Sequence, residues 1–489
     1  MKEKNEKIPN QKELEKEIGE FLSKKFGNNI KVVSPMGLSQ ELSMEKPETP
    51  HAAGKKISFD LKPEDLVAYL DQYMVKQDDA KAILATKICT HFNRIKRAQE
   101  YPDDHSDMVG SIKNNVLMIG PTGVGKTYMI RLIAKKIGVP FVKGDATKFS
   151  ETGYVGGDVE DLIRDLVREA DNDVGMAQYG IIYIDEIDKI ASSQNFAGAD
   201  VSRTGVQRAL LKPMEETEVE LKVPHDPISM IQEIEQYRKT GKREKRTVNT
   251  RNILFIMSGA FSELSEIIHK RITDRGIGFG AKLTGSESDA RILNQVKSED
   301  VIKFGFESEF VGRLPVRTVF ENLGEADLFE ILKSPNNPII LGKKLDFGAY
   351  GIEVKFEDEA LKLLAEEAFS ENTGARGLVS AIERKLLLFE KKLPSTDIKK
   401  FPVTEDVIKN PRSSLEALLG STDSADLDRT FARLEEEEKQ RIREYVEENK
   451  QRLSEKYGLT LTSSRIEVVA AYYSRHTMDI GNADRKSVV

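Results

Sequence analysis

The chain contains 489 residues, 32% of them charged, and carries a formal net charge of −7. This length accommodates about three domains, and the negative charge balance argues against nucleic acid as the main ligand. No apolar run is long enough to cross a membrane, and residues 1–7 lead into no apolar segment, so we expect a cytoplasmic protein without a secretory signal. The single cysteine, Cys89, excludes a disulfide framework and a cysteine-based zinc site, and we expect it to be a small buried hydrophobic side chain.

The first 60 residues form an N-terminal extension whose pattern differs from the rest of the chain. An amphipathic helix is expected around residues 11–26, and the stretch near 35–56, rich in proline, serine and glutamate, is typical of a linker. Helical patterns then follow over about 62–100, with a break at 73–77.

A phosphate-binding loop follows a short apolar strand at 115–119. Residues 120–127 read Gly-Pro-Thr-Gly-Val-Gly-Lys-Thr, and the stretch 128–136 has helical periodicity. The glycines allow a tight turn whose N–H groups face phosphates, Lys126 would neutralise the β- and γ-phosphates, and the Thr127 hydroxyl would bind Mg²⁺. The residues expected to contact the nucleotide are Gly120, Pro121, Thr122, Gly123, Val124, Gly125, Lys126, Thr127 and Tyr128. An accidental glycine-rich turn is the alternative, but strand, motif and helix all agree on ATP and Mg²⁺ as cofactors.

A second apolar strand, 181–184, ends at two acidic residues. Asp185 is placed to hold Mg²⁺ through its water shell, and Glu186 to polarise the attacking water. The alternative is a helix-capping acid followed by a solvated one. In combination with the phosphate-binding loop, the pair favours ATP hydrolysis.

The strands of this region alternate with helices. They are expected near 115–119, 140–143, 181–184, 252–257 and 316–320, which predicts an α/β fold with a doubly wound parallel sheet. Within it, residues of about 216–250 form a charged insertion that ends in a basic run, 238–246, for which a solvated loop is the alternative.

Three more residues stand out by their context. Tyr154 lies between glycines, where an aromatic side chain on a mobile loop could push against a sliding partner; an ordinary turn with a packed tyrosine is the alternative. Arg313 is suited to stabilise phosphoryl charge, or else forms a surface salt bridge. Arg376 opens a helix, where an anionic partner would offset its unfavourable position in the helix dipole.

The chain is expected to divide into four parts. These are the extension and linker 1–60, a large ATPase domain 61–325, a smaller and mainly helical domain 326–411 with a short strand at 352–356, and a helical C-terminal extension 412–489.

Taken in order, the motifs of residues 62–400 resemble those of the ClpX/HslU family of AAA+ unfoldases. The segments that carry this resemblance are 120–127, 153–156, 185–186, 205–211, 275–279, 303–306, 310–315 and 374–377. The apolar tripeptide Ile277-Gly278-Phe279 favours the ClpX side of the family, since HslU lacks it.

The resemblance implies a role for each matching residue. Tyr154 and Val155 would line the axial channel and grip substrate polypeptide, while Arg313 would be an arginine finger acting on the neighbouring subunit. Arg376 would be the sensor that couples nucleotide state to domain rotation, and Val75 would pack on adenine. Ser258 would occupy the polar sensor position after the strand 252–257. Ile277, Gly278 and Phe279 would dock on a ClpP-type peptidase.

Three departures from the family pattern limit which roles can be transferred from the family to this chain. The zinc module that normally precedes the ATPase has no counterpart, since Cys89 is the only cysteine. The charged insertion 216–250 replaces the basic loop of the pore entrance. The extension 412–489 has no family counterpart.

The expected function is therefore an ATP-dependent protein unfoldase and translocase. The resemblance implies a ring, a hexamer in this family, that delivers protein substrates to a ClpP-type peptidase. The alternative is a stand-alone remodeller without a peptidase, and a nucleic-acid motor is disfavoured by the net charge.

Overall fold

We describe the protein from a computed structural model. It describes residues 59–101, 113–149, 158–192, 201–221, 247–275, 289–420, 424–458, 460–475 and 480. The helix expected around 11–26, the linker, the basic run 238–246, Tyr154, Val155 and the tripeptide 277–279 lie outside these ranges.

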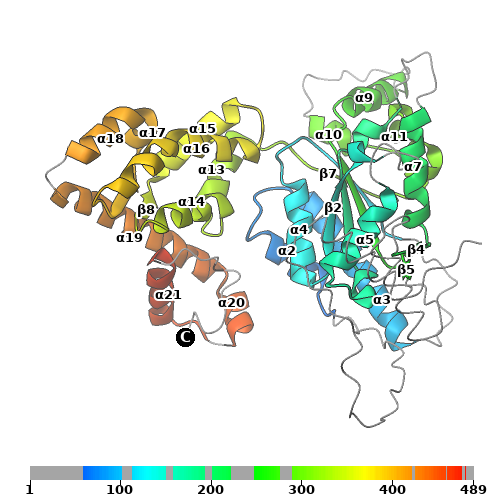
Figure 1. Ribbon diagram of the computed structural model, residues 1–489, viewed down its shortest axis with the longest axis horizontal. Coiled ribbons are helices and arrows are strands. Elements are labelled where there is room, and N and C mark those ends of the chain that lie inside the picture. Colours follow the sequence, from blue (N-terminus) through cyan, green and yellow to red (C-terminus); the bar gives the residue numbers. More distant parts are fainter. Residues whose placement is uncertain are drawn as a thin grey trace, which may run out of the picture. The chain divides into compact units, whose positions relative to one another are not determined.

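A five-stranded parallel sheet organises the first part of the described chain (Figure 1). Its strands lie in the order β2-β3-β6-β1-β7. They are β1 (Val116–Ile119), β2 (Phe141–Asp145), β3 (Ile181–Asp185), β6 (Leu254–Gly259) and β7 (Val316–Val319). All five expected strands are confirmed, and in register Asp145 pairs with Asp185 at the carboxyl ends of β2 and β3.

Alternate residues of each strand enter two separate hydrophobic cores. Val116 and Met118 belong to one core, whereas Leu117 and Ile119 belong to the other. A strand that is buried on both faces reads as a continuous apolar run, which is why these segments were recognisable in the sequence.

Helices cover both faces of this sheet, as a doubly wound fold requires. The core shared by Val116 includes residues of α2 (Pro63–Leu70), α3 (Asp78–Glu100) and α4 (Lys126–Ile137). The opposite core includes residues of α5 (Val159–Glu169), α7 (Val201–Met214), α9 (Leu264–Arg275), α11 (Ser298–Phe304) and α12 (Ser308–Gly312). Short helices α6 (Val174–Ala177) and α10 (Asp289–Leu293) complete this part. Cys89 on α3 is buried as expected, and this burial raises the pKa of its thiol to about 11.

The ends of the charged insertion are strands, which the sequence analysis did not predict. Strand β4 (Glu218–Glu220) pairs antiparallel with β5 (Thr247–Asn249), and Val219 lies opposite Val248 in their register. Both valines are buried in the same core as α5 and α7, so this two-stranded ladder fixes the base of the insertion.

A mainly helical domain follows the sheet, as predicted. It contains α13 (Glu325–Lys333), α14 (Pro338–Gly348), α15 (Asp358–Ser370), α16 (Ala375–Lys392) and α17 (Glu405–Lys409). The expected short strand is β8 (Glu353–Phe356), but it has an unpredicted partner, β9 (Lys400–Val403), with which it pairs in parallel. Pro402 in β9 lacks a backbone donor, so the segment did not read as a strand.

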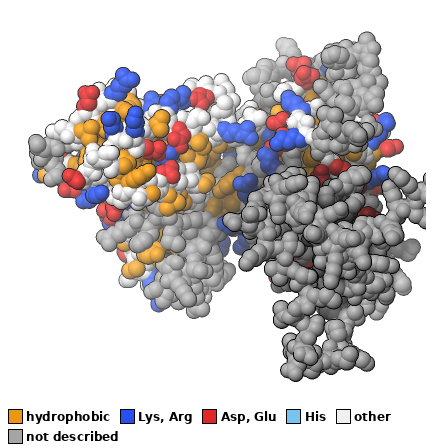
Figure 2. All heavy atoms as spheres, in the orientation of Figure 1, with side chains coloured by type: hydrophobic (Ala, Val, Ile, Leu, Met, Phe, Trp, Pro, Cys, Tyr) orange, Lys and Arg blue, Asp and Glu red, His pale blue; other side chains and the backbone are white. Residues whose placement is uncertain are grey.

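The C-terminal extension is helical, as predicted. Helices α18 (Pro411–Gly420), α19 (Ser424–Glu448), α20 (Lys450–Tyr457) and α21 (Ser463–Arg475) make it up. Helix α19 packs against β8 and β9, and it also packs against α21 in a small core of its own that includes Val446 and Ala470. In the view of Figure 2, hydrophobic side chains lie between charged ones on the surface of the helical domain. The exposed large hydrophobic residues of α15, α16 and α18 include Phe369, Leu387 and Leu419.

Within the described ranges, no helix is both long and apolar enough to span a membrane.

Candidate functional site

Residues 122–127 of the phosphate-binding loop line a cavity of about 600 Å³ at the carboxyl ends of the parallel strands, whereas Gly120 and Pro121 are not among its wall residues. Thr122, Gly123, Val124, Gly125, Lys126, Thr127 and Tyr128 all contribute to its wall. Ligands of open α/β sheets bind at this edge because the strand-to-helix loops converge there.

Two positions of the loop, 123 and 125, require glycine because their backbone has a positive φ angle. Gly123 has a φ of +77°, and a Cβ at this position would come within 2.0 Å of the carbonyl oxygen of Thr373. The backbone N–H of Ala375, at the start of α16, donates to the carbonyl of Gly123 over 2.9 Å. Gly125, with a φ of +93°, directly precedes the first turn of α4, whose N–H groups have no intrahelical acceptor. The loop can therefore approach phosphates closely with its backbone.

Lys126 is buried and turned into the loop. Its ammonium donates to the carbonyls of Gly120 and Pro121 over 2.5 and 2.6 Å. Burial lowers the pKa of Lys126 to about 8, with Asp185 and Asp188 acting in the opposite direction. An ammonium that is held by two neutral carbonyls would be strongly stabilised by a phosphate anion.

Asp185 is held by side chains from the strands on either side of its own. The ammonium of Lys143, on β2, lies 2.8 Å from the Asp185 carboxylate, and the hydroxyl of Ser258, on β6, donates to it over 2.6 Å. Burial acts to raise the pKa of Asp185, but these two contacts outweigh it and the pKa is lowered. Asp185 is therefore a carboxylate, the form that binds cations.

A chain of hydroxyl groups joins Thr127 to Asp185. Thr127 donates to the Tyr183 hydroxyl over 3.0 Å, and Tyr183 lies 2.6 Å from the Ser258 hydroxyl. The Tyr183 hydroxyl also lies 3.4 Å from the Asp185 carboxylate, so with the Ser258 proton donated to Asp185, Tyr183 donates to Ser258 or to Asp185 itself. Burial raises the pKa of Tyr183 to about 12, which keeps it protonated as a donor.

The oxygen atoms of Thr127 and Asp185 fit a magnesium ion in type and number. Mg²⁺ is usually held by one or two protein oxygens together with phosphate oxygens and water. Across the described residues, no group of three or more His, Cys, Asp or Glu side chains could hold a metal by itself. The donor set thus suits an ion that arrives with a nucleotide.

Glu186 adopts a backbone conformation that is uncommon for glutamate. Its φ is +56°, it is exposed, and it lines the cavity beside Asp185. It directly precedes a short 3₁₀ helix (Ile187–Ile190), but its side chain makes no capping hydrogen bond. Such strain in a non-glycine residue is typical of functional sites, and helix capping does not account for it here.

Two predicted nucleotide contacts from distant parts of the sequence also line the cavity. Val75 lies in the break between α2 and α3, and Arg376 lies in the first turn of α16. Arg376 is close enough to Lys126 to act on its pKa. No acidic residue occurs in the first turn of α16, which leaves this end of the helix open to an anion.

Arg313, by contrast, lies on a different opening. It lines a cavity of about 690 Å³ together with His91, Lys113 and Glu215, and its guanidinium is 2.5 Å from the Glu215 carboxylate, with both side chains about half exposed. The structure does not bring Arg313 to the nucleotide pocket of its own chain.

Lys143 and Tyr183 were not predicted as residues of the site. Tyr183 was the only polar residue within the apolar stretch 181–184, which was an available signal. Lys143 gave no such signal because its contact with Asp185 depends on the pairing of β2 with β3. The cavity wall also includes Asn337 and Ser334, from the segment between α13 and α14.

Known families match two regions of the chain. The AAA domain (Cdc48 subfamily) matches residues 112–317, and the C-terminal, D2-small domain of ClpB protein matches residues 340–391. Two relatives are proteins named ATP-dependent Clp protease ATP-binding subunit ClpX, from Borrelia duttonii (strain Ly) and Borrelia recurrentis (strain A1). Each is 40% identical over 353 residues, which cover 71% of this chain and 78% of the relative.

The chain belongs to the ClpX family. It is an AAA+ ATPase with a large α/β domain and a smaller helical domain, and it binds nucleotide. Helices α19–α21 lie beyond the matched residues 340–391, so the family match to the small domain does not account for them.

Proposed function

We propose that this protein is an ATP-dependent unfoldase and translocase that works as a ring, by family analogy a hexamer. One observation carries the proposal: the described chain gathers the phosphate loop, Asp185, Glu186 and Arg376 around one cavity, while Arg313 faces another. A trans-acting arginine has to point away from the nucleotide site of its own chain.

Within the ring, each residue has a distinct proposed task. Lys126 and the loop N–H groups bind the phosphates of ATP, Val75 packs on the adenine, and Thr127 and Asp185 hold Mg²⁺. Glu186 orients and deprotonates the attacking water, with Asp185 kept ionised beside it.

Residues outside the cavity would transmit the result of hydrolysis. Arg313 of one subunit stabilises the phosphoryl charge in its neighbour, and Arg376 couples nucleotide state to movement between residues 61–325 and 326–411, the two proposed ATPase domains. Tyr154 and Val155 grip the substrate polypeptide, and Ser258 senses the nucleotide through Asp185.

The proposed peptidase partner rests on the relatives. Their name makes them ATP-binding subunits of an ATP-dependent Clp protease. We extend that association to this chain, with Ile277, Gly278 and Phe279 as the docking residues for a ClpP-type peptidase in the cytoplasm.

A Tyr154→Ala variant tests the translocation step. It should hydrolyse ATP at close to the normal rate but fail to unfold a tagged fluorescent substrate, because the site of hydrolysis is intact while the grip is lost. The measurements are phosphate release and loss of substrate fluorescence.

Glu186→Gln is the matched control. It should bind ATP and lose both activities, with turnover reduced by about 10²–10⁴-fold, the usual loss on removing a general base. Unfolding by Tyr154→Ala at the normal rate would refute the pore assignment, and unchanged turnover in Glu186→Gln would refute the assignment of Glu186.

A further inference from the structure

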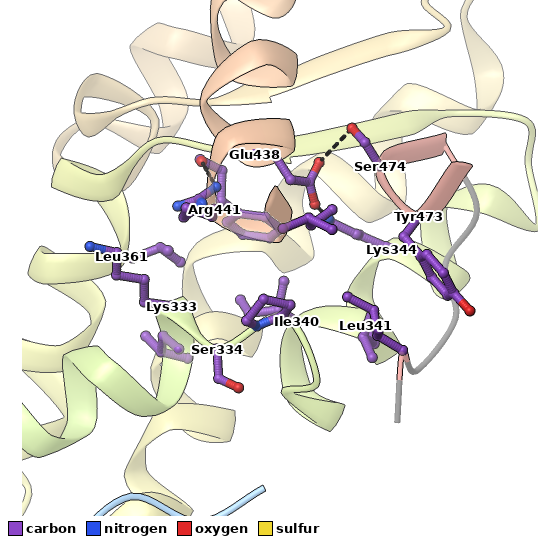
Figure 3. A pocket seen from close by; sticks show the side chains of 15 residues that line it. Lys333, Ser334, Ile340, Leu341, Lys344, Leu361, Glu438, Arg441, Tyr473 and Ser474 are labelled. Carbon is purple, nitrogen blue, oxygen red and sulfur yellow. Dashed lines mark hydrogen bonds and ion pairs between the residues drawn. The ribbon is translucent and has the colours of Figure 1, made fainter. Parts of the chain in front are cut away.

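A third, smaller cavity of about 50 Å³ lies between the C-terminal helices and the segment that joins α13 to α14 (Figure 3). The charged and hydroxyl-bearing part of its wall comes from Lys333, Ser334 and Lys344 on one side and from Glu438, Arg441 and Ser474 on the other, while most of the remaining wall is apolar and includes Ile340, Phe356 and Leu361. None of these side chains has a task in the proposed ATPase mechanism.

Two lysines in this region share one carboxylate. The ammonium groups of Lys344 and Lys355 both pair with Glu438, the latter over 2.6 Å, and all three side chains are at most 14% exposed. Lys355 is also held by the carbonyl and the hydroxyl of Ser474. Among the described residues, Glu438 is the one acceptor that Lys344 contacts, so its positive charge is the less compensated one.

A second group of charged side chains next to the first also contains two cations and only one carboxylate. Arg441 pairs with Asp358, and the ammonium of Lys333 lies 3.8 Å from the same carboxylate. In total, the cations Lys333, Lys344, Lys355 and Arg441 face the two carboxylates of Asp358 and Glu438, which leaves a net charge of +2.

The part of this excess around Glu438 is buried, whereas Lys333 and Asp358 are more than a third exposed and partly screened by water. A buried excess of positive charge is unfavourable unless an anion compensates it. Removing an ion from water is unfavourable, and one carboxylate cannot fully compensate two buried ammonium groups. The effect is visible at Lys344, where burial lowers the pKa despite the attraction of Glu438, with Lys355 and Arg441 acting in the same direction as burial.

The dimensions of the cavity limit what could provide the compensating charge. A single water molecule needs roughly 10–15 Å³ of such space, so about 50 Å³ exceeds the need of one water. The space suits a small tetrahedral oxyanion but not a nucleotide. Lysine and arginine donors are the usual partners of phosphate oxygens.

We propose that this cavity is a binding site for a small oxyanion of the phosphate type, held by Lys344, Arg441 and Lys333. Bound there, the anion would accept hydrogen bonds from donors of α13, α14 and α19 at once and would fix the C-terminal helices to the helical domain. Ser334 lines both this cavity and the nucleotide pocket, so the two sites are neighbours that share this residue.

The test is a titration of the full-length protein with inorganic phosphate, followed by calorimetry. The nucleotide site is first saturated with Mg²⁺ and a non-hydrolysable ATP analogue, so that phosphate cannot bind at Lys126. Sodium chloride at equal ionic strength separates specific binding from screening. We expect saturable phosphate binding by the wild type, weakened at least tenfold in Lys344→Met.

Two further variants make the result decisive. Lys362→Met removes an exposed cation next to the cavity wall residue Leu361 and should bind phosphate as the wild type does. Lys333→Met changes a partly exposed side chain, so this variant should fold normally even where Lys344→Met does not, and should bind several-fold more weakly. Absence of saturable binding by the wild type, or wild-type affinity in both Lys344→Met and Lys333→Met, would overturn the proposal.

Discussion

The hydroxyl of Tyr183 connects Thr127, which follows Lys126 in the phosphate-binding loop, with Asp185 at the end of β3. This hydroxyl accepts from Thr127 and lies 2.6 Å from the Ser258 hydroxyl and 3.4 Å from the Asp185 carboxylate, to which Ser258 donates. Side chains from different elements are therefore fixed relative to one another by contacts within the protein, and preorganisation of this kind reduces the cost of forming a metal site.

Replacing Tyr183 by Phe should weaken this connection without opening a cavity. Each lost hydrogen bond is worth about 1 kcal/mol, so we expect ATP turnover to fall by roughly five- to tenfold and the magnesium requirement to rise. Steady-state ATP hydrolysis at varied Mg²⁺ measures both effects.

Tyr179→Phe provides the comparison for this variant. Its hydroxyl contacts Gln99 rather than the site, so turnover should stay normal. Equal magnesium dependence in the wild type and in Tyr183→Phe would contradict the role given to this hydroxyl.

His91 should make the stability of the large domain depend on pH. Burial lowers the pKa of His91 to about 4 against an ordinary 6.5, while Nε2 contacts the Asn252 carbonyl over 3.0 Å. Between these two pH values the unfolded chain binds a proton that the folded chain does not, so stability falls as the pH is lowered from 6.5 toward 4. The full shift corresponds to about 3 kcal/mol.

A His91→Gln variant should lose this part of the pH dependence, since glutamine can still donate to Asn252 but does not titrate. Thermal unfolding midpoints at pH 7 and pH 5 measure the difference. His269→Gln, at an exposed position of α9, should keep the wild-type slope. The same slope in His91→Gln would show that other groups cause the acid destabilisation.

At the scale of elements, α19 joins the C-terminal helices to the helical domain. It packs on β8 and β9, its Leu434 side chain is fully buried, and its charged face is held by pairs such as Arg433 with Glu357, which are 2.6 Å apart. Exposed ion pairs contribute little, so the buried apolar face should carry most of the attachment.

Leu434→Ala should therefore loosen α19 while the nucleotide site stays intact. A buried Leu→Ala change costs about 2–5 kcal/mol. We expect rapid proteolytic cleavage within residues 412–489 and normal nucleotide binding. Leu419→Ala, at an exposed leucine of α18, is the matched control and should resist protease as the wild type does. Equal protease resistance of the two variants would show that this face of α19 is not the attachment.

At the scale of the whole molecule, the proposed partner is a peptidase. A few apolar anchors supply most of the binding energy of an interface, and the tripeptide 277–279 is the apolar candidate of this chain. Phe279→Ala should abolish co-migration with a ClpP-type peptidase in size-exclusion chromatography, with ATPase activity unchanged.

The outcome of this experiment separates two functions. Co-migration that survives Phe279→Ala would remove the docking assignment, and absence of co-migration with the unmodified protein would favour a stand-alone remodeller. Ala281→Ser, two residues after Phe279, is a conservative control that should leave co-migration intact.

The sequence by itself determined the sheet and the centre of the nucleotide site. The motif residues 120–127 are adjacent in the chain, so their chemistry is visible without a fold, and doubly buried strands such as 116–119 appear as apolar runs. Local sequence patterns also predicted the helices of the C-terminal extension. They did not predict strand β9 of the helical domain, which contains a proline.

Only the tertiary structure decided which side chains complete each site. Lys143 and Ser258 reach Asp185 because β3 lies between β2 and β6, an order that no local pattern encodes. Likewise, Lys344 and Lys355 meet Glu438 across 94 and 83 residues of sequence. Pairings at such separation depend on how whole elements pack, which is why the local patterns of the sequence did not reveal them.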